Sequence, residues 1–197
     1  MPDLSPDSHA ITDTTPRRLP LCAGLTIQNE LTRFAVLLTL GLALPWLIHL
    51  VPVAHSNLGV VLMPLAIPVV LAAFVLPLRS ALAVAVGLPA VSVLTSGMPP
   101  LWPPIAGQVV VEGLATVAAV HLALRHGRTG WQGALLAGLV ANRLVALITA
   151  LVIAETVTGE STLLATIGVA WGCVGLSVNF LLLPVLIRLF REDSRGR

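Results

Sequence analysis

The chain has 197 residues, of which 56% are hydrophobic and 10% are charged, and its mean hydropathy is +0.95. Soluble domains carry about 25% charged residues, so this composition excludes a water-soluble globular protein and predicts an integral membrane protein. The net charge of +2 says little by itself, but the positions of the arginines along the chain are informative.

Residues 1–30 differ in composition from the rest of the chain. They begin MPDLSPDSHAITDTTPRRLP, which is rich in Pro, Asp, Ser and Thr and predicts a disordered tail. No apolar stretch follows Arg17 and Arg18 directly, so the tail does not read as a signal peptide. The two cysteines, Cys22 and Cys173, lie in unrelated surroundings, and we interpret them as small apolar residues and not as a disulfide pair.

Six apolar segments follow the tail. A membrane-spanning helix needs about 20 mostly apolar residues, and the segments that approach this length are 33–53, 58–77, 80–95, 105–124, 131–153 and 163–189. The sequence therefore predicts an all-α integral membrane protein with six transmembrane helices. They form one membrane domain over residues 31–190, followed by a basic tail at 191–197.

The arginines alternate between the connectors of these six segments. They fall in the N-terminal region, the second and fourth connectors and the C-terminal tail, at Arg17, Arg18, Arg33, Arg79, Arg125, Arg128, Arg188, Arg191, Arg195 and Arg197. The first, third and fifth connectors contain no arginine, and the fifth carries Glu155 and Glu160. Because cytoplasmic loops are enriched in Lys and Arg, this pattern predicts a multi-pass membrane protein with both termini in the cytoplasm.

Small residues mark one face of the first segment. Ala35, Thr39 and Ala43 are spaced four residues apart, which favours close packing against another helix. Packing inside this chain and docking of a partner protein explain the pattern equally well.

The first external connector, HLVPVAHSN at residues 49–57, holds two histidines six residues apart. Neither a cysteine nor a carboxylate accompanies them, so the connector does not have the ligand set of a metal site. Contacts from His55 and Asn57 to a ligand, or simple polar residues at the membrane interface, both remain possible roles.

The third connector, SVLTSGMPPLWPP at residues 92–104, is predicted to face outward. Its proline pairs fix the backbone and reduce the number of N–H groups that need partners. It is either a rigid turn at the membrane surface, with Trp102 as an interfacial anchor, or a preformed rim over a site between helices.

Two ionisable residues stand well inside predicted helices, Glu112 and Arg143. At 1.5 Å per residue they lie roughly 10 Å and 15 Å below the outer surface, close enough to meet directly or through a ligand. Charges inside a membrane are expensive and indicate function, but a structural ion pair that locks two helices is the alternative. Gln108 and Thr116 share the helix face of Glu112, since the three are spaced four residues apart.

The last apolar segment carries Gly168, Gly172, Gly175 and Asn179 on one stripe. The glycines allow helices to approach closely, and we expect Asn179 to make a hydrogen bond between helices.

In the fifth segment, Asn142 is expected to face a neighbouring helix.

Catalytic motifs are missing from the sequence. It contains neither a nucleotide-binding loop nor a GxSxG or HExxH motif, and no basic and aromatic pattern suggests nucleic acid. We therefore expect a protein that is not an enzyme and that needs no cofactor or metal.

The region from Leu47 to His121 resembles the substrate-binding S component of energy-coupling-factor (ECF) vitamin transporters. The residues that carry the resemblance are Met63-Pro64, Pro68, Pro89, Ser92, Gly97-Met98-Pro99-Pro100 and Glu112, and Asn142-Arg143 stands where relatives often have Gly-Arg. The chain departs from the family pattern in the turn at residues 76–79, which lacks Gly-Pro, and at Thr39, where an alanine would be expected.

The resemblance implies a subunit that captures a vitamin or cofactor precursor at the outer face for ATP-driven uptake. It implies a transmembrane coupling subunit and two cytoplasmic ATPases as partners, the coupling subunit docking on Ala35, Thr39 and Ala43. The residues that would contact the substrate are Gln108, Glu112, Arg143, His55, Asn57, Ser92, Trp102 and Trp171, the tryptophans by stacking on a ring.

Two other hypotheses stay open. One is a membrane scaffold or assembly subunit without transport activity, and the other is an intramembrane enzyme that uses Glu112. The identity of the substrate cannot be read from the sequence.

Overall fold

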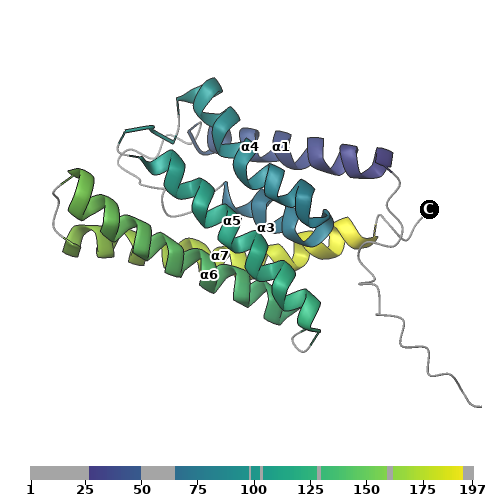
Figure 1. Cartoon of the computed structure of the whole chain (residues 1–197). Helices are drawn as coiled ribbons and strands as arrows, with labels where there is room; N and C mark the ends of the chain where they lie inside the picture. Colours follow the sequence, from purple (N-terminus) through teal and green to yellow (C-terminus); the bar gives the residue numbers. More distant parts are fainter. Residues whose placement is uncertain are drawn as a thin grey trace, which may run out of the picture.

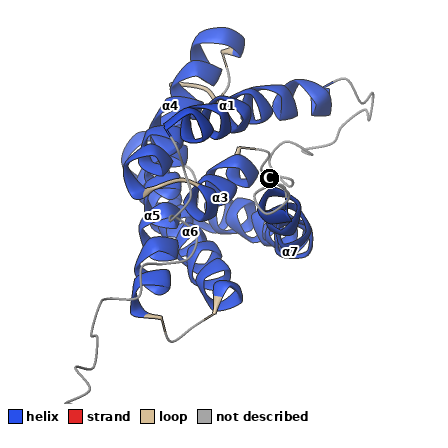
Figure 2. Cartoon of the chain, turned by 90° about the vertical axis from the view of Figure 1, so that its right-hand side faces the viewer, coloured by secondary structure: helices blue, strands red, loops and turns tan. Residues whose placement is uncertain are grey.

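A computed structural model describes residues 27–49, 65–97, 99–102, 104–127, 130–158 and 162–192 (Figure 1). Over these ranges the chain is helical, without strands, which confirms the predicted all-α class there (Figure 2). The elements are α1 Ile27–His49, α3 Ala66–Val75, α4 Leu78–Ser96, α5 Ile105–His126, α6 Trp131–Ile153, the π-helical turn η1 Ala154–Thr158 and α7 Thr162–Glu192.

Helices α1 and α3 differ from the predicted segments, whereas α7 matches the predicted 163–189 to within three residues at each end. Helix α1 begins at Ile27, inside the predicted tail. The carboxylate of Glu30, in the first turn of α1, accepts a hydrogen bond from Ser80 at the start of α4. The polar first turn of α1 is therefore stabilised by a residue far away in the sequence, which local composition cannot predict. The second predicted span is described only as the ten-residue helix α3, and helix α7 is 31 residues long.

Three helical stretches are long and apolar enough to cross a bilayer. They are Leu78–Ser96, Ile105–His126 and Trp131–Val157, and two shorter apolar stretches are Ala66–Val75 and Gly172–Ile187. Large apolar side chains also lie on the surface of the bundle, as expected for helices that contact lipid. Leu144, Ile148 and Leu181 are each more than half exposed. These features indicate a membrane protein.

The helices pack in three tiers (Figure 1). Helices α1 and α4 lie on one side, α6 and α7 on the other, and α3 and α5 lie between them. Helix α3 contacts α1, α4, α5 and α7, which explains why every side chain from Pro68 to Val75 is buried. The hydrophobic core is formed by side chains from six helices, among them Leu37, Leu71, Leu88, Val117, Leu135 and Leu183.

Glycines bring neighbouring helices close together. A Cβ placed on Gly138 of α6 would lie 2.5 Å from Val120 Cγ2 of α5, and one on Gly113 of α5 would lie 3.3 Å from the Cβ of Ala85 in α4. Contacts this short exclude larger side chains at both positions. Helix α5 is therefore held tightly against both α4 and α6.

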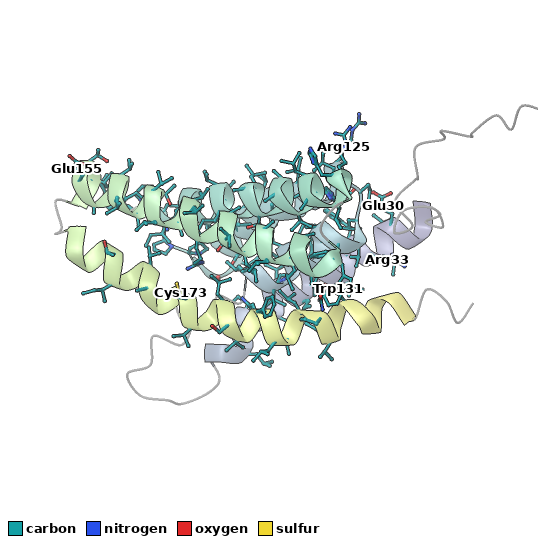
Figure 3. All side chains as sticks on the ribbon, turned by 90° about the horizontal axis from the view of Figure 1, so that it is seen from below. Glu30, Arg33, Arg125, Trp131, Glu155 and Cys173 are labelled. Atoms are coloured by element: carbon teal, nitrogen blue, oxygen red, sulfur yellow. The ribbon has the colours of Figure 1, made fainter. Side chains whose placement is uncertain are left out.

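The two ends of the bundle differ in charge. Figure 3 places Glu30, Arg33, Arg125 and Trp131 at one end and Glu155 at the opposite end. We call the first the basic end. Helices α1, α4 and α6 start at this end, and α5 and α7 return to it (Figures 1 and 3).

Candidate functional site

Glu112 is the centre of a buried polar cluster between α5 and α6. Only 5% of the residue is exposed, although it lies in an apolar helix. Gln108, one turn earlier, donates a hydrogen bond from Nε2 to Glu112 Oε1 at 2.8 Å. Arg143 of α6 places Nη2 3.9 Å from Glu112 Oε2, so the predicted meeting of these two charges is confirmed.

Asn142 holds the guanidinium of Arg143. Its Oδ1 accepts hydrogen bonds from Arg143 Nη2 at 2.6 Å and from Arg143 Nε at 3.2 Å. Asn142 is 8% exposed and, as predicted, faces a neighbouring helix. The asparagine thereby fixes the orientation of the guanidinium next to the carboxylate. We call Gln108, Glu112, Asn142 and Arg143 the polar cluster.

Thr116 lies one turn after Glu112 on α5, and Ser92 lies on the neighbouring helix α4. The Thr116 hydroxyl donates to the carbonyl oxygen of Glu112 at 2.7 Å, which satisfies it within α5. Ser92 is buried on α4, the helix that packs against α5, and its carbonyl oxygen accepts a hydrogen bond from Ser96 at 2.7 Å. Both residues contribute to the packing beside the cluster.

Trp102 lies apart from the polar cluster. It is 75% exposed in the connector between α4 and α5, beside Leu101, which is 70% exposed. This exposure suits an interfacial anchor better than a residue enclosed around a ligand. His55 and Asn57 lie outside the described residues, and so does the side chain of Trp171, although its backbone belongs to α7.

The small residues of α1 face outward. Ala35, Thr39 and Ala43 are all exposed, whereas Leu37 and Gly41 on the opposite face are buried. Of the two explanations offered by the sequence, packing within the chain does not apply to the part that the structure describes. The track is accessible to lipid or to another helix.

Asn179 of α7 departs from the expectation that it makes a hydrogen bond between helices. It is 2% exposed and lies on a buried stripe with Gly172, Gly175 and Leu183. Its Oδ1 has no hydrogen-bond partner in the described structure, so the expected hydrogen bond between helices is not made by this oxygen. The sequence shows an amide side chain in an apolar segment, and this pattern alone does not indicate whether the amide is hydrogen-bonded.

A groove of about 580 Å³ runs between α6 and α7. Its lining is apolar apart from Arg143, Cys173 and Ser177, and it includes Leu136, Leu139, Val140, Leu144, Leu176, Phe180 and Leu181. Figure 3 shows Cys173 on this side of α7. Arg143 therefore belongs to the polar cluster inside the bundle and also lines the groove between α6 and α7.

The cluster is chemically suited to binding. It combines a carboxylate, a guanidinium and two amides in apolar surroundings, where hydrogen bonds are stronger than in water. Within the described ranges, no group of three His, Cys, Asp or Glu side chains is placed to hold a metal ion.

Comparison with known proteins identifies no relative. No family model, no curated protein and no solved structure matches the chain.

Proposed function

We propose that this chain is the substrate-binding membrane subunit of an ECF-type importer, and that it captures a vitamin or cofactor precursor for ATP-driven uptake. The proposal rests on the resemblance in sequence between Leu47 and His121. The single structural observation that supports it is the polar cluster, in which Glu112 and Arg143 are brought together inside an apolar helical bundle.

The cluster supports the proposal because burying ionisable side chains inside a membrane costs free energy, and such residues indicate a functional site. Ionisable side chains within membrane helices are rare and commonly line substrate pathways. Small-molecule sites are mostly apolar with a few convergent polar groups, and the four residues of the cluster converge from two adjacent helices.

In this proposal the chain crosses the bacterial plasma membrane six times, with the basic end and both termini in the cytoplasm. The separation of Arg33 and Arg125 from Glu155 supports this orientation, since basic residues are retained on the cytoplasmic side. Helix α3 would then form the inner part of the second span, reaching the basic end just before Arg79.

The transmembrane coupling subunit docks on the exposed track of Ala35, Thr39 and Ala43, and two cytoplasmic ATPases complete the importer. The exposure of all three residues supports this assignment, because a docking surface must be open in the isolated subunit. Small side chains would let the partner helix approach closely.

The test is mass spectrometry of the small molecules that remain bound to the detergent-purified chain. We expect one vitamin-like compound at a stoichiometric amount in the wild type, and its loss in Glu112→Gln and in Arg143→Met. Val178→Ala, an exposed change on α7 outside the lining of the groove, is the control that should keep the compound. A wild-type protein without any bound compound would contradict the proposal.

A membrane scaffold is the second candidate, and one observation favours it. Glu112 already receives a hydrogen bond from Gln108 and faces Arg143, which Asn142 holds in place, so the cluster can serve as a lock between α5 and α6 without a ligand. The same experiment separates the two functions, because a lock predicts unstable variants and an empty wild type.

A further inference from the structure

A second polar position lies in the same layer of the bundle as the polar cluster. At 1.5 Å per residue, Glu112 lies about 21 Å from the end of α5, Asn142 about 17 Å from the start of α6 and Asn179 about 20 Å from the end of α7. These three helix ends lie at the basic end (Figures 1 and 3). Helix α6 contacts both α5 and α7, and Arg143, next to Asn142, lines one groove together with Ser177 and Phe180, which flank Asn179 on α7.

The two sides of this layer differ in how their polar atoms are satisfied. On the side of α5 and α6, Gln108, Asn142 and Arg143 surround the Glu112 carboxylate. On the side of α7, Asn179 Oδ1 is buried without a partner in the part of the chain that the structure describes. Leaving a buried carbonyl oxygen unpaired costs free energy, so such a group requires an explanation.

Small residues flank Asn179 on its buried stripe. Gly175 and Gly172 lie about one and two turns away on the same buried stripe, toward the end of the bundle that carries Glu155. Among the described residues, His121 Nε2 is also buried without a partner, but it lies about 8 Å from the end of α5 and therefore outside this layer. Asn179 is thus the member of the layer whose hydrogen bond is missing.

We propose that Asn179 is a further ligand-binding residue, and that its Oδ1 accepts a hydrogen bond from an N–H or O–H group of the substrate. This inference rests on the proposed function. It narrows the substrate class to molecules that present a hydrogen-bond donor toward α7 while another part of the molecule meets the polar cluster. A substrate with only acceptors at that position would leave the oxygen unpaired and is excluded.

The test compares wild type with Asn179→Leu, which has similar volume and no hydrogen-bonding group. The full chain in lipid nanodiscs is heated with and without a mixture of the water-soluble B vitamins, and affinity for any vitamin that stabilises the wild type is measured by titration. Without vitamins, we expect the variant to unfold at the wild-type temperature or above, because it no longer buries an unpaired oxygen. With the vitamin, we expect affinity to fall about 5- to 100-fold.

Control variants separate the possible outcomes. Val178→Ala should bind as the wild type does, and Asn179→Ala tests whether the bulk of leucine is responsible for any loss of stability. If both Asn179 variants unfold earlier without vitamins, the amide is a structural group and the inference is wrong. If Asn179→Leu keeps full affinity while Glu112→Gln loses it, the inference is wrong and the proposed function stands. A wild type that none of the vitamins stabilises would overturn both.

Discussion

Arg143 and Glu112 face each other across the α5–α6 contact, with 3.9 Å between Nη2 and Oε2 and with side chains that are only 12% and 7% exposed. The pair lies where the two helices also approach through Gly138, one turn from Asn142. The ion pair and the close approach of the two helices therefore lie in the same part of the α5–α6 contact.

The first prediction concerns the stability of this pair. Arg143→Met leaves the Glu112 carboxylate buried without its counter-charge, which should lower the free energy of unfolding by about 3–5 kcal/mol. The double variant Glu112→Gln/Arg143→Met removes both charges and should recover most of that loss. Unfolding of the detergent-solubilised chain measures both effects, and Arg125→Met at the exposed basic end is the control.

The same double variant separates the two candidate functions. A stable double variant that no longer retains a small molecule supports binding, because the fold survives and the site does not. A double variant as unstable as Arg143→Met would contradict this account of the pair, since no uncompensated charge remains in it.

The second prediction concerns the packing of α5 against α6. Gly138→Ala places a Cβ 2.5 Å from Val120 Cγ2, and we expect this overpacking to destabilise the chain by about 1–3 kcal/mol. Gly107→Ala on α5 is the matched control, because a Cβ there meets no atom of the described structure within 4 Å. Equal unfolding temperatures for the two variants would show that α5 and α6 are not packed this closely.

The third prediction concerns the exposed track on α1. Ala35→Leu and Ala43→Leu should change the free energy of unfolding by less than about 0.5 kcal/mol, because both positions lie on the surface. Both should prevent purification of a complex with co-expressed coupling and ATPase subunits. Ala118→Leu, an equally exposed change on α5, should leave the complex intact. Full assembly with bulky residues at both α1 positions would place the docking surface elsewhere.

The fourth prediction concerns orientation in the membrane. In a background with Cys22 and Cys173 replaced by serine, a cysteine at Glu155 should react with a membrane-impermeant maleimide in intact cells. A cysteine at Arg125 should react only after the cells are permeabilised, because the basic end is placed in the cytoplasm. The reverse pattern would invert the proposed topology.

The sequence predicted those features that depend on local composition. Periodicity and hydropathy located α4, α5 and α6 to within a few residues, and residue counting predicted that Glu112 and Arg143 would meet. It could not predict that α1 begins at Ile27, since the polar start of this helix is paired through Ser80, 50 residues away from Glu30.

Asn179 shows the same limit within the site. An asparagine among apolar residues indicates a buried polar group, and the sequence correctly placed it on the glycine stripe of α7. Whether its oxygen is paired depends on the side chains that α3 and α6 bring next to α7, and that is decided by tertiary packing.

ATP-dependent uptake into proteoliposomes tests the central claim most directly. Liposomes that contain the chain with its coupling subunit and two ATPases are supplied with radiolabelled B vitamins outside and ATP on the cytoplasmic side. The account predicts that one compound accumulates, that accumulation requires ATP, and that Glu112→Gln abolishes it. Uptake that is the same with and without this chain would contradict its assignment as the substrate-binding subunit.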